Sequence, residues 1–193
     1  MEEPVVDIIM ATYNGAKYVS EQIESIQRQS YKNWRLLISD DCSSDATLDI
    51  VRSYTKSDDR IKLISNEVKF GGAMPNFLNA LSKSESSLFM FCDQDDIWLE
   101  DKIKISVEYI TSLENEFGTD KPIFVSSDMK IVDDDLNLLS SSFINYERFG
   151  TKDSSLGHAL IENNVWGCTI IGNASLRIWL NRCASYDGLI MHD

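Results

Sequence analysis

The sequence predicts an α/β domain built on a mostly parallel, doubly wound sheet with a smaller mixed C-terminal part. In the first half of the chain, short apolar runs that end in polar residues alternate with segments of helical periodicity. No repeat, low-complexity tract or obvious linker divides the 193 residues, of which 43% are apolar. Alternating strands and helices favour parallel strands joined by right-handed crossovers. A chain of this size and composition can bury one core, so we expect a single domain.

The first half predicts four strands that alternate with three helices. The strands are expected at 5–11, 34–39, 61–65 and 87–92, and the helices at 17–30, 46–54 and 75–83. Each strand is a short apolar run, and the first ends at the polar sequence TYNG. The first helix is predicted because Val19, Ile23 and Ile26 recur on one helical face.

Local signals set the starts of the next two helices. Asp45 is expected to cap the second helix, with Leu48 and Val51 turned inward. Pro75 suits the first turn of the third helix, where a missing N–H group costs no hydrogen bond. The last of the four strands, SLFMFC, then leads directly into the acidic sequence DQDD.

The second half lacks the regular alternation of strands and helices seen in the first half. We expect a helix at 99–116, a strand at 122–128, a hairpin at 129–142 that turns at 133–135, a loop at 142–153, a helix at 154–163, a strand at 167–172 and a helix at 174–183. The chain then stops at LIMHD without a closing element, so we expect C-terminal truncation.

Charge and cysteine usage exclude several functional classes. With 18 basic and 31 acidic residues and no basic run, the formal charge of −13 excludes nucleic acid as the expected partner. An acidic chain that handles a phosphorylated substrate needs a cation between the two sets of negative charge. The four cysteines form no CxxC pair, so we expect reduced packing residues and a cytoplasmic protein. The N-terminus resembles no signal peptide, and no apolar run is long enough to cross a membrane.

Polar residues follow three of the expected strands, at the edge where open α/β sheets bind ligands. They are 12–14, 40–41 and 93–96, with the sequences TYN, DD and DQDD. The acid pair could instead cap a helix, and DQDD could be a solvated loop ahead of a helix dipole. Crowded carboxylates beside a buried strand favour a bound cation, however, and hard oxygen ligands favour Mg²⁺ or Mn²⁺. Two separated histidines are too few for zinc, and no GxGxxG or P-loop motif occurs.

These motifs resemble a known family. The stretch VDIIMATYNGAKYVSEQIESIQRQSYKNWRLLISDDCSSDAT, followed by FCDQDDIW and ending in MHD, resembles the family-2 glycosyltransferases of GT-A fold. It is most similar to their rhamnosyltransferase-like branch, which builds bacterial surface polysaccharides. The resemblance covers essentially the whole chain. It implies a nucleoside diphosphate sugar donor, a divalent cation and an inverting displacement.

The resemblance assigns roles to residues that match the family motifs. It implies that Ala11, Thr12 and Tyr13 hold a pyrimidine base by backbone and ring, and that Asp41 accepts a hydrogen bond from the base N3. It further implies that Asp93 reaches the ribose and that Asp95 ligates the Mn²⁺ or Mg²⁺ ion that bridges the diphosphate. By its position alone, Asp96 is expected to cap the following helix.

The acceptor side is assigned by the same resemblance. Asp193, within MHD, matches the carboxylate that takes the proton of the acceptor hydroxyl. The segment NNVWGCT resembles the acceptor-lining part, which places Asn164 and Trp166 there. Trp166 could stack on a sugar or belong to the core.

The expected function is therefore sugar transfer from dTDP-rhamnose, or alternatively a UDP-hexose, to a glycan or lipid-linked glycan. Residues 1–98 would form the nucleotide-sugar-binding half and 99–193 the acceptor-side half of one catalytic domain. We expect a cytoplasmic protein at the inner face of the membrane, docked through a missing C-terminal region. A nucleotide-sugar-binding module without turnover is the alternative. A receiver-type signalling domain fits less well, because its acid pair would follow the first strand, which here ends in ATYNG.

Overall fold

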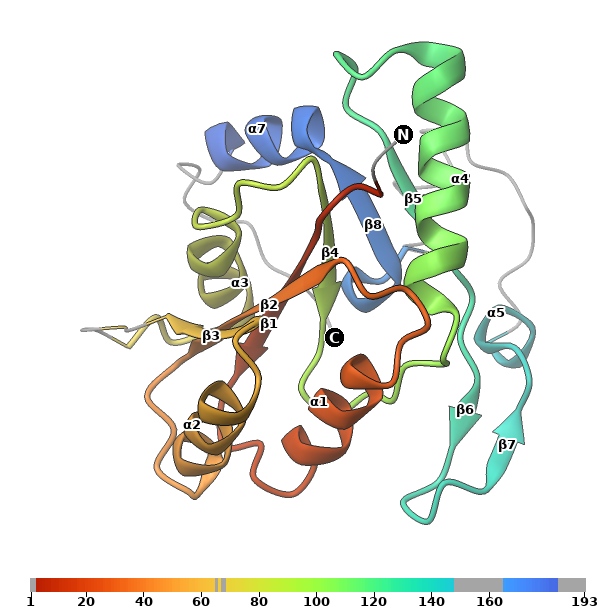
Figure 1. Cartoon of the computed structure of the whole chain (residues 1–193). Coiled ribbons are helices and arrows are strands. Elements are labelled where there is room, and N and C mark those ends of the chain that lie inside the picture. The colour runs from red at the N-terminus through yellow and green to blue at the C-terminus, as the bar shows by residue number, and fades with distance from the viewer. Residues whose placement is uncertain (1–2, 65, 67–68, 148–164, 184–193) are drawn as a thin grey trace.

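A six-stranded sheet forms the centre of the molecule, in the order β3-β2-β1-β4-β8-β5 (Figure 1). The computed structural model describes residues 3–64, 66, 69–147 and 165–183. Its first four strands are β1 (Val6–Thr12), β2 (Trp34–Asp40), β3 (Ile61–Ile64) and β4 (Leu88–Cys92). All of them pair in parallel, which confirms the expected strands to within one residue at each end.

The remaining strands make the sheet mixed, as expected for the C-terminal part. Strand β8 (Ile170–Asn173) pairs antiparallel with β4, and β5 (Phe124–Ser126) pairs antiparallel with β8. A separate hairpin joins β6 (Ile131–Val132) to β7 (Leu138–Ser140), as the sequence predicts. Asp133 fixes its turn by accepting the backbone N–H groups of Asp135 and Asn137, at 3.0 and 2.8 Å.

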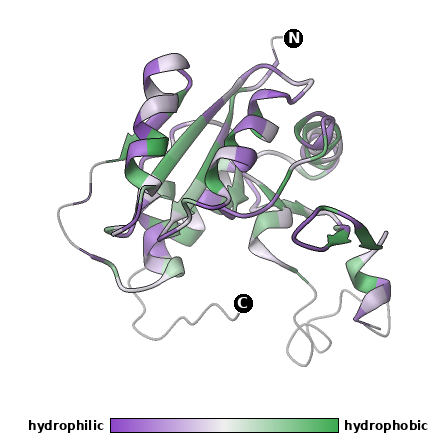
Figure 2. Ribbon diagram, turned by 90° about the horizontal axis from the view of Figure 1, so that it is seen from below, coloured by the Kyte–Doolittle hydropathy of each residue, from purple (hydrophilic) through white to green (hydrophobic). Residues whose placement is uncertain are grey.

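Helices cover both faces of the sheet, because successive side chains along the buried strands point to opposite faces and are apolar on both. In β1, Ile8 and Met10 pack toward α1 (Val19–Gln27), α2 (Thr47–Ser57) and α4 (Lys102–Phe117). Ile9 and Ala11 pack toward α3 (Ala73–Leu81) and α7 (Ala174–Cys183). Figure 2 shows the largely hydrophobic strands between these helices.

Several expected boundaries were wrong. The long helix begins at Lys102 with Asp101 as its N-cap, so Asp96 does not cap it. The N-cap of α2 is Ala46, one residue beyond Asp45, although Asp45 still accepts the Thr47 N–H group at 3.0 Å. The expected loop at 142–153 begins with a short helix, α5 (Phe143–Tyr146), whose N-cap Ser142 accepts the Asn145 N–H group.

The strand expected at 167–172 begins later than predicted. A 3₁₀ turn, η1 (Gly167–Thr169), precedes β8. The helix at 174–183 is confirmed as α7, and the helix expected at 154–163 lies outside the described residues.

A buried carboxylate ties the N-terminal ends of the parallel strands together. Asp7 of β1 is 0% exposed and forms an ion pair with Arg35 of β2, at 2.8 Å. It also accepts hydrogen bonds from the Ser84 hydroxyl and from the backbone N–H groups of Glu85 and Ser86, ahead of β4. Burial acts to raise the pKa of Asp7, but the hydrogen bonds from Arg35, Ser84 and Ser86 outweigh it and hold the pKa below its usual value.

We predict that Asp7→Asn lowers the free energy of unfolding by about 2 to 4 kcal/mol, because it leaves Arg35 and at least one buried N–H group without a charged acceptor. The native pKa of Asp7 is depressed, so its contribution is present above the unfolded pKa of about 4 and is lost as the pH falls through the native pKa. Urea denaturation at pH 7 and pH 3 measures both effects. The exposed Asp49, substituted by Asn, serves as control and should change stability little. Equal stability of Asp7→Asn and wild type at pH 7 would contradict the assignment.

Candidate nucleotide-sugar site

The carboxyl ends of β1, β2 and β4 meet where the strand order turns back, between β1 and β4. Open α/β sheets bind ligands at such a switch point. A cavity of about 680 Å³ opens there, and all six residues that the sequence resemblance assigns to nucleotide-sugar binding line it. Its lining residues are Ala11, Thr12, Tyr13, Asp41, Lys69, Gly71, Gly72, Ala73, Asn76, Phe77, Asp93, Gln94 and Asp95.

The end of β1 offers the cavity an aromatic ring. Tyr13 is 45% exposed, whereas Thr12 is buried and donates its hydroxyl hydrogen to Asp40 at 2.8 Å. The Lys69 ammonium group donates to the Tyr13 hydroxyl at 3.0 Å and lies 4.2 Å from the ring centroid. This hydrogen bond is the main cause that raises the pKa of Lys69, and the charge of Asp41 adds to it. The cavity therefore carries one fixed positive charge beside an exposed ring.

The two acids at the end of β2 have separate structural partners. Asp40 accepts hydrogen bonds from the hydroxyl groups of Thr12 and Ser43 and from the Ser43 N–H group, so it organises the turn toward α2. Asp41 is 4% exposed and accepts the backbone N–H groups of Phe70 and Gly71, the latter at 3.0 Å. The helix-capping interpretation of the pair is therefore wrong for Asp40, because its partner Ser43 precedes Ala46, the N-cap of α2. Asp41 lines the cavity, and its hydrogen bonds to Phe70 and Gly71 fix the loop after β3, which forms another wall of the cavity.

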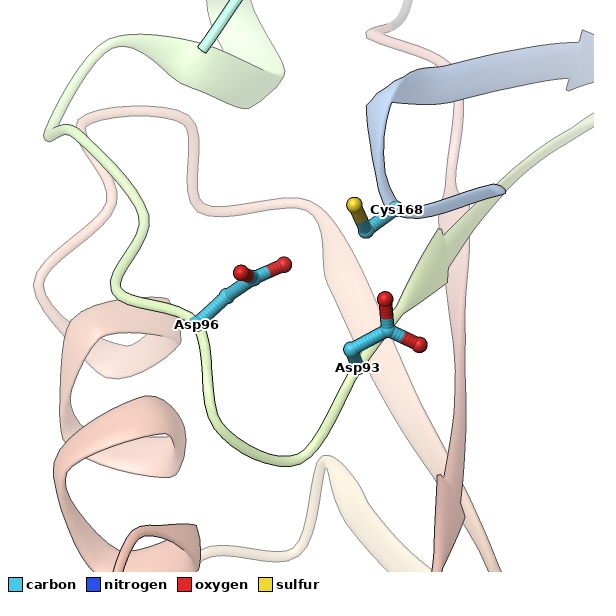
Figure 3. Close-up of side chains that lie close together, drawn as sticks. All are labelled: Asp93, Asp96 and Cys168. Carbon is cyan, nitrogen blue, oxygen red and sulfur yellow. The ribbon is translucent and has the colours of Figure 1, made fainter. Parts of the chain in front are cut away.

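The acids after β4 divide between the cavity and the interior. Asp93 and Asp95 line the cavity, and Asp95 is exposed. Asp96 does not line the cavity, and its side chain lies close to those of Cys168 and Asp93 (Figure 3). One ligand atom from each of Asp93, Asp96 and Cys168 lies within 4.8 Å of the others. This cluster places the 3₁₀ turn before β8 beside the acidic loop.

Burial governs the charges around Asp96. Burial raises the pKa of the Asp96 carboxyl; the hydrogen bond with Cys168 and the charge of Lys102 oppose this, while the charge of Asp95 adds to it. Burial also raises the pKa of the Cys168 thiol well above its ordinary value, and the nearby carboxylates add to this shift. Burial lowers the pKa of Lys102. The Asp96 carboxylate is therefore stabilised by the charge of the half-buried Lys102 and by a hydrogen bond with the Cys168 thiol.

The donor set in the cavity fits a hard divalent cation. Asp93 and Asp95 offer carboxylate oxygens, which Mg²⁺ and Mn²⁺ prefer. The inward cluster fits such an ion less well, because a thiol binds metals as its thiolate and the pKa of Cys168 is raised. The exposed Asp95 is thus the group best placed to share an ion with a ligand in the cavity.

Little of the expected acceptor side lies within the described residues. Trp166 packs edge to face on Phe143 of α5, with ring centroids 4.7 Å apart, and it does not line the cavity. Asn164 and Asp193 lie outside the described residues. The cysteines also differ from the packing role expected of them: Cys92 is buried, but Cys42 is exposed and Cys168 contacts the acids.

Sequence reasoning missed the wall that follows β3. Lys69, Gly71 and Gly72 line the cavity, as does Asn76 of α3. Gly71 has a positive φ of 79°, a conformation that glycine adopts without strain. The buried Oδ1 atom of Asn76 has no hydrogen-bond partner among the described residues. The position of this segment after a parallel strand, next to the acid pair, was the signal that could have found it.

The chain matches known proteins over the part that forms this site. A sequence model of glycosyl transferase family 2 matches residues 7–157. The putative teichuronic acid biosynthesis glycosyltransferase TuaG of Bacillus subtilis is 34% identical over 56% of this chain and 42% of its own length. The UDP-Glc:alpha-D-GlcNAc-diphosphoundecaprenol beta-1,3-glucosyltransferase WfgD of Escherichia coli is 39% identical over 55% of this chain and 41% of its own. The dTDP-rhamnosyl transferase RfbG of Shigella flexneri is 39% identical over 51% of this chain and 36% of its own length.

Solved structures of S. aureus TarS share the fold. TarS 1–349 in complex with UDP-GlcNAc is 29% identical, with a TM-score of 0.52 over 55% of this chain and 31% of that one. A second structure of TarS 1–349 has a TM-score of 0.58 over 94% of this chain and 49% of that one, at 21% identity. The chain spans about two fifths of the length of the curated relatives TuaG and WfgD. Within the described residues, no helix combines the length and apolar composition needed to cross a membrane.

The fold and the family match agree. The mostly parallel sheet has the GT-A arrangement, and the match begins inside β1 and includes the loops after β1, β2, β3 and β4 that line the cavity. Because this match extends over well more than half of the sequence, the chain belongs to glycosyl transferase family 2.

Proposed function

We propose that this chain transfers a sugar, with inversion, from a nucleoside diphosphate sugar to a hydroxyl group of a bacterial surface glycan. One observation carries the proposal: a single cavity at the switch point brings together Tyr13, Asp41, Asp93 and Asp95. The donor we favour is dTDP-rhamnose, with a UDP-hexose second. RfbG and WfgD, named for these two nucleotide types, are equally similar at 39% identity. Both donors carry a pyrimidine.

In this proposal the pyrimidine lies between the Tyr13 ring and the wall at Gly71. Ala11 and Thr12 contribute backbone at the floor of the cavity. Asp41 accepts the N3 hydrogen of the base in addition to the Phe70 and Gly71 N–H groups, because each carboxylate oxygen can accept more than one hydrogen bond. Guanine also offers a donor, at N1, but its larger ring system places that donor farther from the ribose than N3 of a pyrimidine, so we expect a poorer fit.

We predict that UDP and dTDP raise the melting temperature more than GDP does, in the presence of Mn²⁺. Asp41→Asn should weaken UDP binding about tenfold or more and reduce the preference over GDP, because it replaces one acceptor oxygen by a donor. Titration calorimetry with the three nucleotides measures this. Asp49→Asn is the control and should bind as wild type does. Equal affinity of the wild type for GDP and UDP would count against the base assignment.

The diphosphate lies toward the acidic loop. Asp93 reaches the ribose, and Asp95 would hold a Mn²⁺ or Mg²⁺ ion shared with the diphosphate oxygens. Such an ion, when bound, neutralises charge on the leaving diphosphate. Lys69 is the one cationic residue among those that line the cavity, and its charge favours the anionic ligand. Asp96 remains turned toward Cys168 and takes no part in binding.

We predict that Asp95→Ala abolishes the gain in UDP affinity that Mn²⁺ provides and leaves stability within about 0.5 kcal/mol of wild type, since the residue is exposed. Titrations with Mn²⁺ and with EDTA separate the metal-dependent part of binding. Asp59→Ala removes another exposed carboxylate and is the control. A full Mn²⁺ effect in Asp95→Ala would show that the ion lies elsewhere.

The transfer itself needs a base on the acceptor side. The acceptor oxygen forms a bond to the anomeric carbon as the bond to the diphosphate breaks on the opposite face, and the hydroxyl proton passes to a carboxylate. We assign this role to Asp193. We infer a lipid-linked glycan as acceptor and action at the cytoplasmic face of the membrane, since the name of WfgD specifies a diphosphoundecaprenol-linked acceptor.

We predict that Asp193→Asn lowers kcat about 10²- to 10⁴-fold, the typical contribution of a general base, and leaves the donor Kd nearly unchanged. The assay measures sugar transfer from dTDP-rhamnose or UDP-glucose to a diphosphoundecaprenol-linked sugar. Asp59→Asn is the control. A near-normal kcat in Asp193→Asn would exclude this residue as the base. A wild type that binds the donor but does not hydrolyse it, with or without Mn²⁺, would favour the binding-module alternative.

A further inference from the structure

Gln94, between the two acids of the acidic loop, forms a reciprocal pair of hydrogen bonds with one residue of the opposite loop. The Tyr13 backbone N–H group donates to Gln94 Oε1 at 3.0 Å, and Gln94 Nε2 donates to the Tyr13 carbonyl oxygen at 3.2 Å. An N–H group needs an acceptor and a carbonyl needs a donor, so these partners fix the orientation of the amide. Gln94 therefore pairs with the Tyr13 backbone as a neighbouring strand would.

The chain leaves room for this pair at Gly15. A Cβ atom on Gly15 would lie 2.1 Å from Gln94 Oε1 and 2.5 Å from its Cδ atom. Gly15 has no positive φ, so its backbone conformation does not itself require glycine. Its N–H group donates to the Thr47 hydroxyl at 2.8 Å, which anchors the loop to α2. The absence of a side chain at Gly15 is explained by the close approach of Gln94.

We propose that Gln94 is a positioning residue that fixes the distance between the base-binding ring and the groups that hold the diphosphate. The inference rests on the proposed function, in which Tyr13 contacts the base while Asp93 and Asp95, on either side of Gln94, serve the ribose and the diphosphate. The pair joins the loop after β1 directly to the loop after β4. With it, one ligand can engage both halves of the cavity without first ordering them.

The location of these hydrogen bonds distinguishes a positioning role of Gln94 from a contribution to global stability. Both hydrogen bonds lie at the exposed mouth of the cavity, and neither residue belongs to a core cluster. Their loss should therefore affect global stability little, while a ligand that spans the two loops would lose its prepared site. Such a ligand is UDP with Mn²⁺, whereas uridine and Mn²⁺ with pyrophosphate each occupy one half.

The first test needs no ligand. Gln94→Met keeps the length of the side chain but removes both hydrogen bonds, so hydrogen exchange at the Tyr13 amide should become about tenfold faster or more. Nuclear magnetic resonance resolves this amide from its neighbours. Gln27→Met removes a comparable amide hydrogen bond, to Asp58, outside the cavity and is the control. Unchanged exchange at Tyr13 in Gln94→Met would overturn the inference.

The second test measures coupling between the two halves of the ligand. Gln94→Met should weaken UDP with Mn²⁺ about tenfold, more than the combined losses for uridine and for Mn²⁺ with pyrophosphate. Gly15→Ala should give the same pattern, because it displaces Gln94. In a Gln94→Ala background, the clashing atoms are gone, so adding Gly15→Ala should cost nothing further.

Each contrary result has one meaning. Losses for UDP that equal the sum for its halves would reduce Gln94 to an ordinary contact and overturn the positioning role. An equal cost of Gly15→Ala with and without the Gln94 side chain would do the same. Failure of the wild type to bind any nucleoside diphosphate would overturn the proposed function and the positioning role with it, and the exchange measurement would still report whether the pair forms.

Discussion

Strand β1 pairs in parallel on both sides, and the positions of the site residues depend on this double pairing. Its last residue, Thr12, lies opposite Asp40 of β2, and Met10 lies opposite Cys92 of β4. The polar residues that follow all three strands therefore emerge at one edge. Because each strand is buried on both faces, a slip in register would place polar side chains in the core, so the packing also fixes the site.

The strands could be predicted from sequence because each is a short apolar run with a polar end, and the six nucleotide-sugar residues followed from motif resemblance. Details that depend on distant partners could not. Asp41 binds the loop after β3, which no local pattern shows, whereas the contact of Asp40 with Ser43 is local. Asp96 lies beside Cys168, which is far along the chain. The pairing of Gln94 with a backbone likewise leaves no periodic signal.

The acidic residues of the site differ in their neighbours, so their number alone does not give the charge that a ligand meets. From its sequence alone, the acidic loop is expected to need a cation, because its carboxylates are crowded. In the structure, the charge of the half-buried Lys102 and a hydrogen bond from the Cys168 thiol stabilise the Asp96 carboxylate. Asp95, which is exposed at the cavity, is the carboxylate left for a cation. Lys69 adds one positive charge on the side of the base. A nucleoside diphosphate with a divalent cation would complete this balance, which neither component achieves alone.

The most direct test of the account is a crystal structure of this chain grown with UDP and Mn²⁺, with anomalous data that identify the ion. We expect the uracil against the Tyr13 ring with N3 at Asp41, and the ion about 2.2 Å from an Asp95 oxygen, since Mn²⁺ takes oxygen ligands at a distance slightly above that of Mg²⁺. An ion held by Asp96 and Cys168 instead, or a nucleotide bound away from the edge where β1 and β4 end, would contradict the account.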